Sequence, residues 1–149
     1  MTNFFIRITF IFFFSLATWN LLESQELTGT INYTQTSITA INANNAEVTV
    51  PNTTGFTIAD RVLIIQVQGA VINTTNSSAF GDIQDYNGAG NYEIATVCSV
   101  SGNQLVFENE LLNTYDPAGV IQVIKIPQYS NLNITGTLTA SAWNGSQGG

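Results

Sequence analysis

The sequence predicts an all-β protein, a small barrel or sandwich of six to eight short, mainly antiparallel strands. Charged residues make up only 9% of the chain, and its polar residues are mostly Thr, Asn, Ser and Gln. Short segments rich in Val, Ile and Thr alternate apolar and polar residues, as half-buried strands do. Gly, Asn and Pro separate these segments and favour turns. We predict no helix longer than a single turn after residue 24.

Residues 1–24 have the layout of a secretory signal peptide. Arg7 supplies one positive charge, Ile8–Trp19 is an apolar run, and the polar stretch Glu23–Glu26 follows. The alternative is a transmembrane anchor, which needs about 20 apolar residues, more than this run contains. We expect cleavage after Ser24, or alternatively after Ala17, and export through the secretion machinery to the medium or cell surface. No later segment is apolar enough to span a membrane.

Charge and composition exclude several classes of function. The net charge is −7, and Arg61 and Lys125 are the only cations after the predicted leader. Nucleic acid binding is excluded because it needs Lys and Arg to displace counterions. The chain has no His, so Ser-His-Asp and Cys-His nucleophile systems and imidazole metal sites are absent. Cys98 lies in an alternating segment, and we expect it to be buried beside Ile94 and Val100.

The first half of the chain after the leader predicts two strands and a long loop. Residues 25–46 are a polar lead-in, which forms one or two edge strands or stays a linker. Glu47–Val50 is a short strand ended by a proline. Arg61–Gln68 is the strongest strand, and its apolar residues on both faces favour a central place in the sheet. Residues 73–91 are a long loop rich in Gly, Asn and Ser.

The second half begins with a hairpin, in which Asn91–Val100 and Gln104–Phe107 flank a turn over residues 101–103. We further expect one helical turn over 108–113 and strands over 120–126, 132–134 and 137–140. Residues 47–136 therefore form the all-β domain. Residues 137–149 are expected to begin a Gly-rich region that continues further, so that the chain is a fragment of a longer protein.

Several short motifs resemble the N-terminal module of large secreted surface proteins of Bacteroidota. They are Gly55-Phe56, Asp60–Ala70, Gly88–Glu93, Val123–Tyr129 and Trp143-Asn144-Gly145. The resemblance implies an adhesin-like or gliding-motility-associated protein that continues through Gly-rich and repeat regions to a sorting domain for type IX secretion. Ala59 departs from the pattern, which has Gly before the Asp. If this turn needs a positive φ, Ala is strained there.

The loop over 73–91 and the strand after it carry the candidate binding residues. Three aromatic residues near amide and carboxylate side chains predict a surface for a sugar, although they can also serve ordinary packing. These residues are Phe80, Tyr86 and Tyr92.

Four oxygen-bearing side chains in the same region suit Ca²⁺, a hard cation that takes oxygen ligands. These are Asp82, Asp85, Asn87 and Glu93. The alternative is a solvated turn, in which Asp and Asn are favoured by local hydrogen bonds. The spacing does not continue as an EF-hand, because Thr96 occupies the place of the final Glu. No other cofactor is expected.

We predict a non-enzymatic extracellular surface or adhesin-like module, the N-terminal part of a larger exported protein with an unidentified surface ligand. The alternative is a secreted carbohydrate-binding module or an accessory domain of a polysaccharide-active enzyme. A glycosidase would need two carboxyl groups about 5–10 Å apart in a cleft. Sequence spacing does not establish such a pair.

Overall fold

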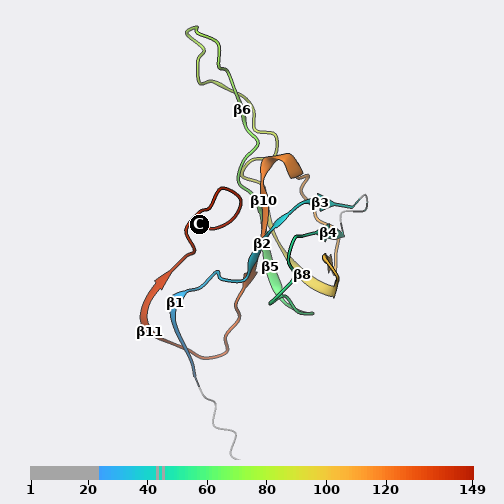
Figure 1. The fold of residues 1–149 in the computed structure, drawn as a ribbon, viewed down its shortest axis with the longest axis vertical. Coiled ribbons are helices and arrows are strands. Elements are labelled where there is room, and N and C mark those ends of the chain that lie inside the picture. The colour runs from blue at the N-terminus through green and yellow to red at the C-terminus, as the bar shows by residue number, and fades with distance from the viewer. Residues whose placement is uncertain (1–23, 43, 45) are drawn as a thin grey trace, which may run out of the picture.

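A computed structural model describes residues 24–42, 44 and 46–149, which fold almost entirely into strands (Figure 1). The all-β prediction is confirmed, and all but one of the strand pairs are antiparallel. The described residues contain eleven strands, more than the six to eight expected. Their strands are β1 (Gln25–Thr30), β2 (Gln35–Ile38), β3 (Ala40–Ile41), β4 (Glu47–Thr49), β5 (Arg61–Gln66), β6 (Val71–Ile72), β7 (Ile83–Asp85), β8 (Tyr92–Ser101), β9 (Gln104–Phe107), β10 (Ile121–Ile126) and β11 (Leu132–Thr139).

Seven strands form one antiparallel sheet, in the order β2-β10-β5-β8-β9-β4-β3. The long strand β8 joins its two halves, because Tyr92–Thr96 pairs with β5 and Val97–Ser101 pairs with β9. Thr39 connects β2 to β3, which lie at opposite ends of the strand order and do not pair with each other. The described sheet therefore folds over on itself like a sandwich and does not close into a barrel.

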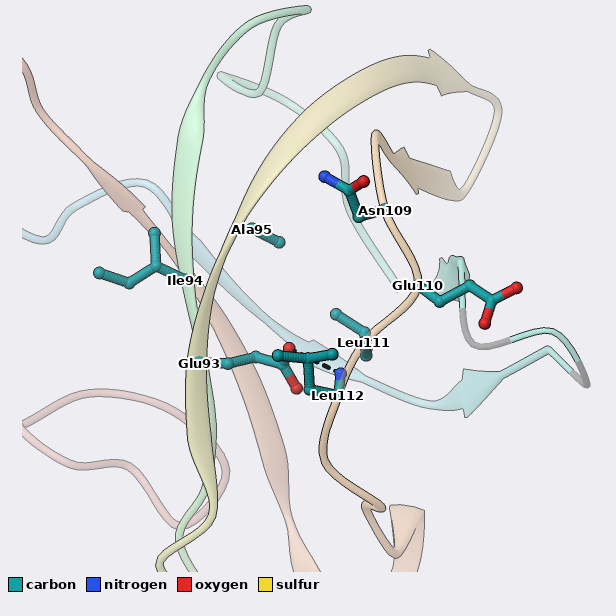
Figure 2. Close-up of a pocket in the computed structure, with 7 residues that line it drawn as sticks. All are labelled: Glu93, Ile94, Ala95, Asn109, Glu110, Leu111 and Leu112. Carbon is teal, nitrogen blue, oxygen red and sulfur yellow. Dashed lines mark hydrogen bonds between the residues drawn. The ribbon is translucent and has the colours of Figure 1, made fainter.

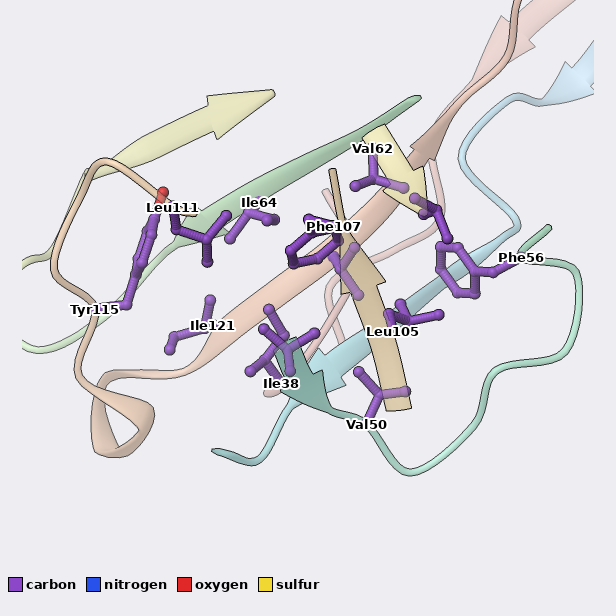
Figure 3. Packing of buried hydrophobic residues seen from close by; sticks show 13 residues of the cluster. Ile38, Val50, Phe56, Val62, Ile64, Leu105, Phe107, Leu111, Tyr115 and Ile121 are labelled. Atoms are coloured by element: carbon purple, nitrogen blue, oxygen red, sulfur yellow. The ribbon is translucent and has the colours of Figure 1, made fainter. Parts of the chain in front are cut away.

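The hydrophobic core lies between the two halves of this sheet (Figure 3). Central strands supply most of it, and alternate residues of β5 and β10 are wholly buried, as period-2 alternation predicts. The buried apolar residues are Ile38, Val48, Val50, Phe56, Val62, Ile64, Val97, Leu105, Phe107, Leu111, Tyr115, Ile121 and Val123.

The expectation that Cys98 is buried is wrong. The pairing of β8 with β9 shifts register between Val97 and Ser99, which places a bulge at Cys98. A bulge inserts one unpaired residue and changes which side chains face the core. Cys98 lies on the same face of β8 as Ile94, which is 52% exposed, and is exposed as well, whereas Val97 on the opposite face is wholly buried. Only beyond the bulge does this series turn inward, at Val100, which packs against the core.

Three other local predictions need correction. Residues 108–113 form no helical turn; the short 3₁₀ helix η1 instead spans Pro117–Gly119. The predicted loop over 73–91 is part of a hairpin, in which β6 and β7 pair and project from the body as an arm (Figure 1). The two strands expected after residue 131 are one strand, β11, which pairs in parallel with β1. The hairpin turn between β8 and β9 is confirmed.

No helix within the described ranges has the length and apolar character to cross a membrane. The predicted signal peptide over 1–24 lies, except for Ser24, outside the described residues and stays a prediction. Of the lead-in over 25–46, β2 belongs to the seven-stranded sheet.

The segment 141–149 is fastened to the outer side of β10 by a buried amide. Gln122 is 3% exposed. Its Nε2 donates to the Gly148 carbonyl at 3.2 Å, and its Oε1 accepts from the Gly148 backbone N–H at 3.1 Å. Gly148 has a φ of 118°, and a Cβ there would collide with the Ala142 carbonyl. Only glycine fits this contact.

Replacing Ala59 with Gly is expected to raise the free energy of unfolding. The φ of Ala59 is 69°. This turn therefore does need a positive φ, and Ala59 is strained as the sequence analysis expected in that case. A non-glycine residue there costs about 1–2 kcal/mol, and the added freedom of Gly in the unfolded chain offsets roughly half of that. We expect a gain of about 0.5–1 kcal/mol in urea denaturation. Ala40→Gly in β3 is the control, and it should lower stability. If both variants lost the same free energy of unfolding, Ala59 would not be strained.

Candidate functional site

A polar groove lies where the arm joins the body, and we call it the Asn87 groove. It has a volume of about 310 Å³ and receives residues from the end of the arm and from the segment before η1. Its lining residues are Asp85, Tyr86, Asn87, Gly88, Asn91, Thr114, Tyr115 and Asp116.

One buried side chain holds the loops that form this groove. Gln66 ends β5 on the core-facing side and is wholly buried. Its Nε2 donates to the carbonyls of Gln68 at 2.8 Å and Asn87 at 2.9 Å, and its Oε1 accepts from the Asp116 backbone N–H at 2.8 Å. Buried amides need such partners, since an unpaired polar group is costly away from water. Gln66 therefore ties the arm and the η1 segment to the central strand.

Three glycines make room for Gln66. A Cβ at Gly69 would lie 2.7 Å from Gln66 Nε2, and a Cβ at Gly88 would lie 2.7 Å from its Oε1. Gly119 has no room for a Cβ against the same amide. Real Cβ contacts are not so short, so each of these loops approaches Gln66 only because it has glycine there.

Side-chain amides cross-link the groove itself. Asn87 donates from Nδ2 to Asp116 Oδ2 at 3.0 Å and from its backbone N to Asp85 Oδ1 at 2.8 Å. Asn91 Nδ2 donates to the Thr114 carbonyl at 2.9 Å. Asn87 has a φ of 47° and Val120, which follows η1, a φ of 54°. Such conformations persist only where their surroundings enforce them, and they concentrate at ligand sites.

A second hollow of about 360 Å³ lies between β8 and the segment after β9 (Figure 2). Its residues are Glu93, Ile94, Ala95, Asn109, Glu110, Leu111 and Leu112. Figure 2 shows the Glu110 carboxylate pointing away from Glu93, while Ile94 points to the other side of β8. The two carboxyl groups of a glycosidase must face the same glycosidic bond, whereas the two carboxylates of this hollow do not face a common point.

Glu93 positions the segment before η1. Its carboxylate accepts from the backbone N–H groups of Leu112 at 2.9 Å and Asn113 at 3.0 Å, and from the Tyr115 hydroxyl at 2.9 Å. Burial alone would raise the pKa of Glu93, but these hydrogen bonds outweigh it and hold the pKa below its ordinary value. Burial and the bond to Glu93 raise the pKa of Tyr115. Glu93 is thus an ionised structural anchor near neutral pH.

The two cations of the described chain lie outside the Asn87 groove. Arg61 and Lys125 line another hollow, of about 410 Å³. Lys125 Nζ lies 2.8 Å from Asp60 Oδ2. Burial raises the pKa of Asp60, but the bonds from Lys125 and Thr57 outweigh it and lower the pKa overall. The Asn87 groove itself has two aspartates and no cation among its lining residues.

The structure gathers some of the sequence-predicted site residues and separates others. Tyr86, Asp85 and Asn87 line the Asn87 groove. Glu93 lies in the second hollow, with its oxygens engaged as described. Asp82 is exposed within the arm.

The remaining predicted aromatic residues, Phe80 and Tyr92, are 66% and 65% exposed and line neither the Asn87 groove nor the second hollow. Within the described ranges no three Cys, Asp or Glu side chains converge as a metal-binding group. Calcium binding stays a prediction.

Sequence reasoning missed Gln66, Asn91 and Asp116. One signal was available for Gln66, because it is the polar member of the buried row that also holds Val62 and Ile64. A polar residue on the buried face of the strongest strand must find buried partners. Its partners come from loops far away in the sequence, so their identity needed the fold.

No family model and no curated protein matches this chain, and the resemblance to Bacteroidota surface proteins stays a prediction. Among solved structures the chain is similar to the Gp54 tailspike of Acinetobacter baumannii bacteriophage AP22, determined in complex with A. baumannii capsular saccharide. The two sequences are 19% identical, with a TM-score of 0.46, over 70% of this chain and 16% of the tailspike chain. A similarity this distant says nothing of what this chain binds.

Proposed function

We propose that the chain is an exported, non-enzymatic surface module that binds an uncharged glycan in the Asn87 groove. The observation that carries the proposal is the lining of the groove, which combines an exposed aromatic ring with carboxylate and amide groups. Tyr86 is 65% exposed and offers a ring face. Sugars present C–H faces to aromatic rings and hydroxyl groups to amides and carboxylates, so such linings are common in binding sites.

The charge of the groove favours an uncharged ligand. Asp85 and Asp116 are the charged lining residues, and the chain as a whole carries a net charge of −7. An acidic saccharide would meet like charges in the groove, which costs binding energy. A neutral hydroxyl group can instead donate to a carboxylate oxygen.

The groove is also built to keep its shape. Gln66 fixes two of its walls, and Asn87 links Asp85 to Asp116 before any ligand arrives. Binding to a preformed groove loses less conformational entropy than binding that must order loops.

The ionised state of Glu93 supports a binding role rather than a hydrolytic one. A general acid in a glycosidase needs a raised pKa, so that it is protonated near neutral pH. The pKa of Glu93 is lowered, and its carboxylate is occupied by backbone and tyrosine donors. The secretory layout of the first residues supports export.

The test is binding of the purified chain to an array of uncharged and acidic polysaccharides. We expect binding to an uncharged glycan, weakened about tenfold by Tyr86→Ala, which corresponds to about 1.4 kcal/mol. Tyr86→Phe keeps the ring and should retain most of the affinity. Tyr33→Ala is the matched control, because Tyr33 is 78% exposed in a different hollow. Binding that survives Tyr86→Ala, or binding to acidic glycans alone, would refute the proposal.

A further inference from the structure

The hollow of about 410 Å³ that holds both cations of the described chain lies at the end of the sheet where β5 begins and β10 ends. We call it the Arg61 hollow. Residues 58–61, Lys125, Ile126 and Gln128 line it, and it shares no lining residue with the Asn87 groove. Two positive charges are thus gathered at one place on a chain whose net charge is −7.

One of these cations, Lys125, is engaged within the protein. Its Nζ lies 2.8 Å from Asp60 Oδ2 and donates to the Gly55 carbonyl at 3.1 Å. The same Asp60 oxygen accepts from the Thr57 backbone N–H at 2.7 Å. Lys125 therefore neutralises Asp60 and ties the end of β10 to the turn before β5.

Arg61 differs from Lys125, because no carboxylate among the described residues lies within ion-pair distance of its guanidinium. The side chain is exposed. Its starting point is fixed, since the ladder sets Arg61 of the central strand β5 between Thr96 of β8 and Ile126 of β10. A guanidinium is a planar fork of N–H donors that matches the two oxygens of a carboxylate. Arg61 is thus a cation placed to receive an anionic group from outside the chain.

The charge of the hollow suits a ligand with a single negative charge. Arg61 and Lys125 carry two positive charges, and the ionised Asp60 cancels one of them. A carboxylate would leave the hollow neutral. A phosphate monoester carries a charge of about −1.5 to −2 and would bring surplus negative charge beside Asp60. Like charges weaken binding, so a carboxylate is the better match.

The rest of the lining suits an aliphatic group beside that carboxylate. Ile58 is 68% exposed and Ile126 is partly buried. Covering such aliphatic surface is favourable. The lining residues include no aromatic ring on which a sugar could stack. An acidic sugar is therefore a poorer match than a peptide, which can carry a carboxylate and an aliphatic side chain next to each other.

The turn that carries Ile58 is held in its conformation by β8. The Ala59 N–H donates to the Val97 carbonyl at 2.8 Å, and the Val97 N–H donates to the Asp60 carbonyl at 2.9 Å. These bonds hold Ala59 at its φ of 69°. Strained residues persist where their surroundings enforce them, and they concentrate at ligand sites.

We propose that the Arg61 hollow binds a peptide segment of a partner protein through one carboxylate. Arg61 holds the carboxylate, and an aliphatic side chain of the segment covers Ile58. The carboxylate belongs either to an Asp or Glu side chain or to the C-terminus of the partner, which share this chemistry. The proposal does not depend on the glycan role of the Asn87 groove.

The test is NMR titration of the isotope-labelled chain with three short peptides. Acetyl-Leu-Glu-Leu-amide has a side-chain carboxylate, acetyl-Leu-Leu-Leu with a free C-terminus has a terminal one, and acetyl-Leu-Gln-Leu-amide has none. We expect the two charged peptides to shift the Arg61 Nε–H signal and the Ile58 and Ile126 amides. Their affinity should be roughly millimolar, because a short free peptide loses much conformational entropy. The glutamine peptide should bind at least about tenfold more weakly, and the tighter charged peptide identifies the source of the carboxylate.

Variants of the chain complete the test. Arg61→Gln should weaken the charged peptides at least about tenfold, and Arg61→Lys, which keeps the charge but loses the fork, should weaken them less. Both should keep the urea midpoint of the parent, because Arg61 is exposed. Ser78→Asp is the matched control, since it makes the same change in net charge on an exposed residue of the arm and should leave the affinity unchanged.

Two results would overturn the proposal: equal binding of the glutamate and glutamine peptides, or equal losses in Arg61→Gln and Ser78→Asp. Tighter binding of inorganic phosphate or glucuronate than of either charged peptide would refute the choice of a peptide ligand. Arg61→Gln should bind glycans as the parent does, so the failure of this proposal and the failure of the glycan proposal are distinguishable.

Discussion

Gln66→Leu should lower the free energy of unfolding by roughly 2–4 kcal/mol, the largest single effect that we expect in this chain. Leucine has nearly the volume of glutamine but no polar atoms. The Asp116 N–H and the carbonyls of Gln68 and Asn87 would lose their partner. Each such loss costs about 1–3 kcal/mol when the group stays buried, and less where water can reach it. Urea denaturation at neutral pH measures the change.

The control for this variant is Gln68→Leu, which makes the same chemical change two residues away on an exposed side chain. We expect its stability to lie within about 0.5 kcal/mol of the parent. Glycan binding should fall in Gln66→Leu even under conditions where it remains folded, because the groove walls lose their common anchor. Equal stability of the two variants would show that the amide of Gln66 is dispensable.

Glu93→Gln should destabilise the chain by roughly 1–2 kcal/mol at pH 7, an effect that shrinks in acid. The glutamine side chain is the same size, but its N–H₂ group replaces one of the two carboxylate oxygens and cannot accept there. Either the bond from Leu112 or the bonds from Asn113 and Tyr115 are therefore lost. The lowered pKa of Glu93 means that the folded state binds a proton less readily than the unfolded state. Its contribution is full above the ordinary pKa of 4.5 and is lost as the pH falls through the lower folded value.

Thermal unfolding of both proteins between pH 7 and pH 3 measures this dependence. The two unfolding curves should approach each other below about pH 4.5, where the unfolded parent chain begins to bind a proton that the folded chain still resists, and should come together only below the lowered folded pKa of Glu93. Glu108→Gln, on an exposed residue of the same segment, should leave the parent profile unchanged. A constant difference between Glu93→Gln and the parent at every pH would mean that the charge of Glu93 contributes nothing.

Sequence patterns predicted the strands and turns that depend on neighbouring residues. The strands around Ile64, Leu105 and Val123 are short runs rich in Val, Ile and Leu, and the turn after Ser101 has the glycine that a tight hairpin needs. Cys98 defeated the same reasoning, because the alternation of β8 does not show which face is buried, and Ile94 on the face of Cys98 is apolar yet exposed. The parallel pairing of β1 with β11 joins segments more than 100 residues apart in the sequence, which no local pattern reports.

The candidate site was predicted in part for a similar reason. Tyr86 was selected as an aromatic ring for a sugar, and Asp85 and Asn87 as oxygen ligands for calcium, and all three stand together in the sequence. Asp116 comes from a distant segment and reaches Asn87 only through the fold. Glu93 was selected as a calcium ligand, which stays a prediction, and its carboxylate accepts hydrogen bonds from Leu112 and Asn113, which the sequence does not place beside it.

The connection through Thr39 has a consequence for how this chain acquires its structure. Strand β2 comes early, yet its sheet partner β10 ends at Ile126. An incomplete chain that stops before β10 can form the β8–β9 hairpin but leaves β2 and β5 without their shared neighbour. Closing such a long loop costs entropy before the contacts repay it, so folding should be slow and completed late. Such late closure would suit the export that we propose, because a chain crosses a secretion channel before it folds.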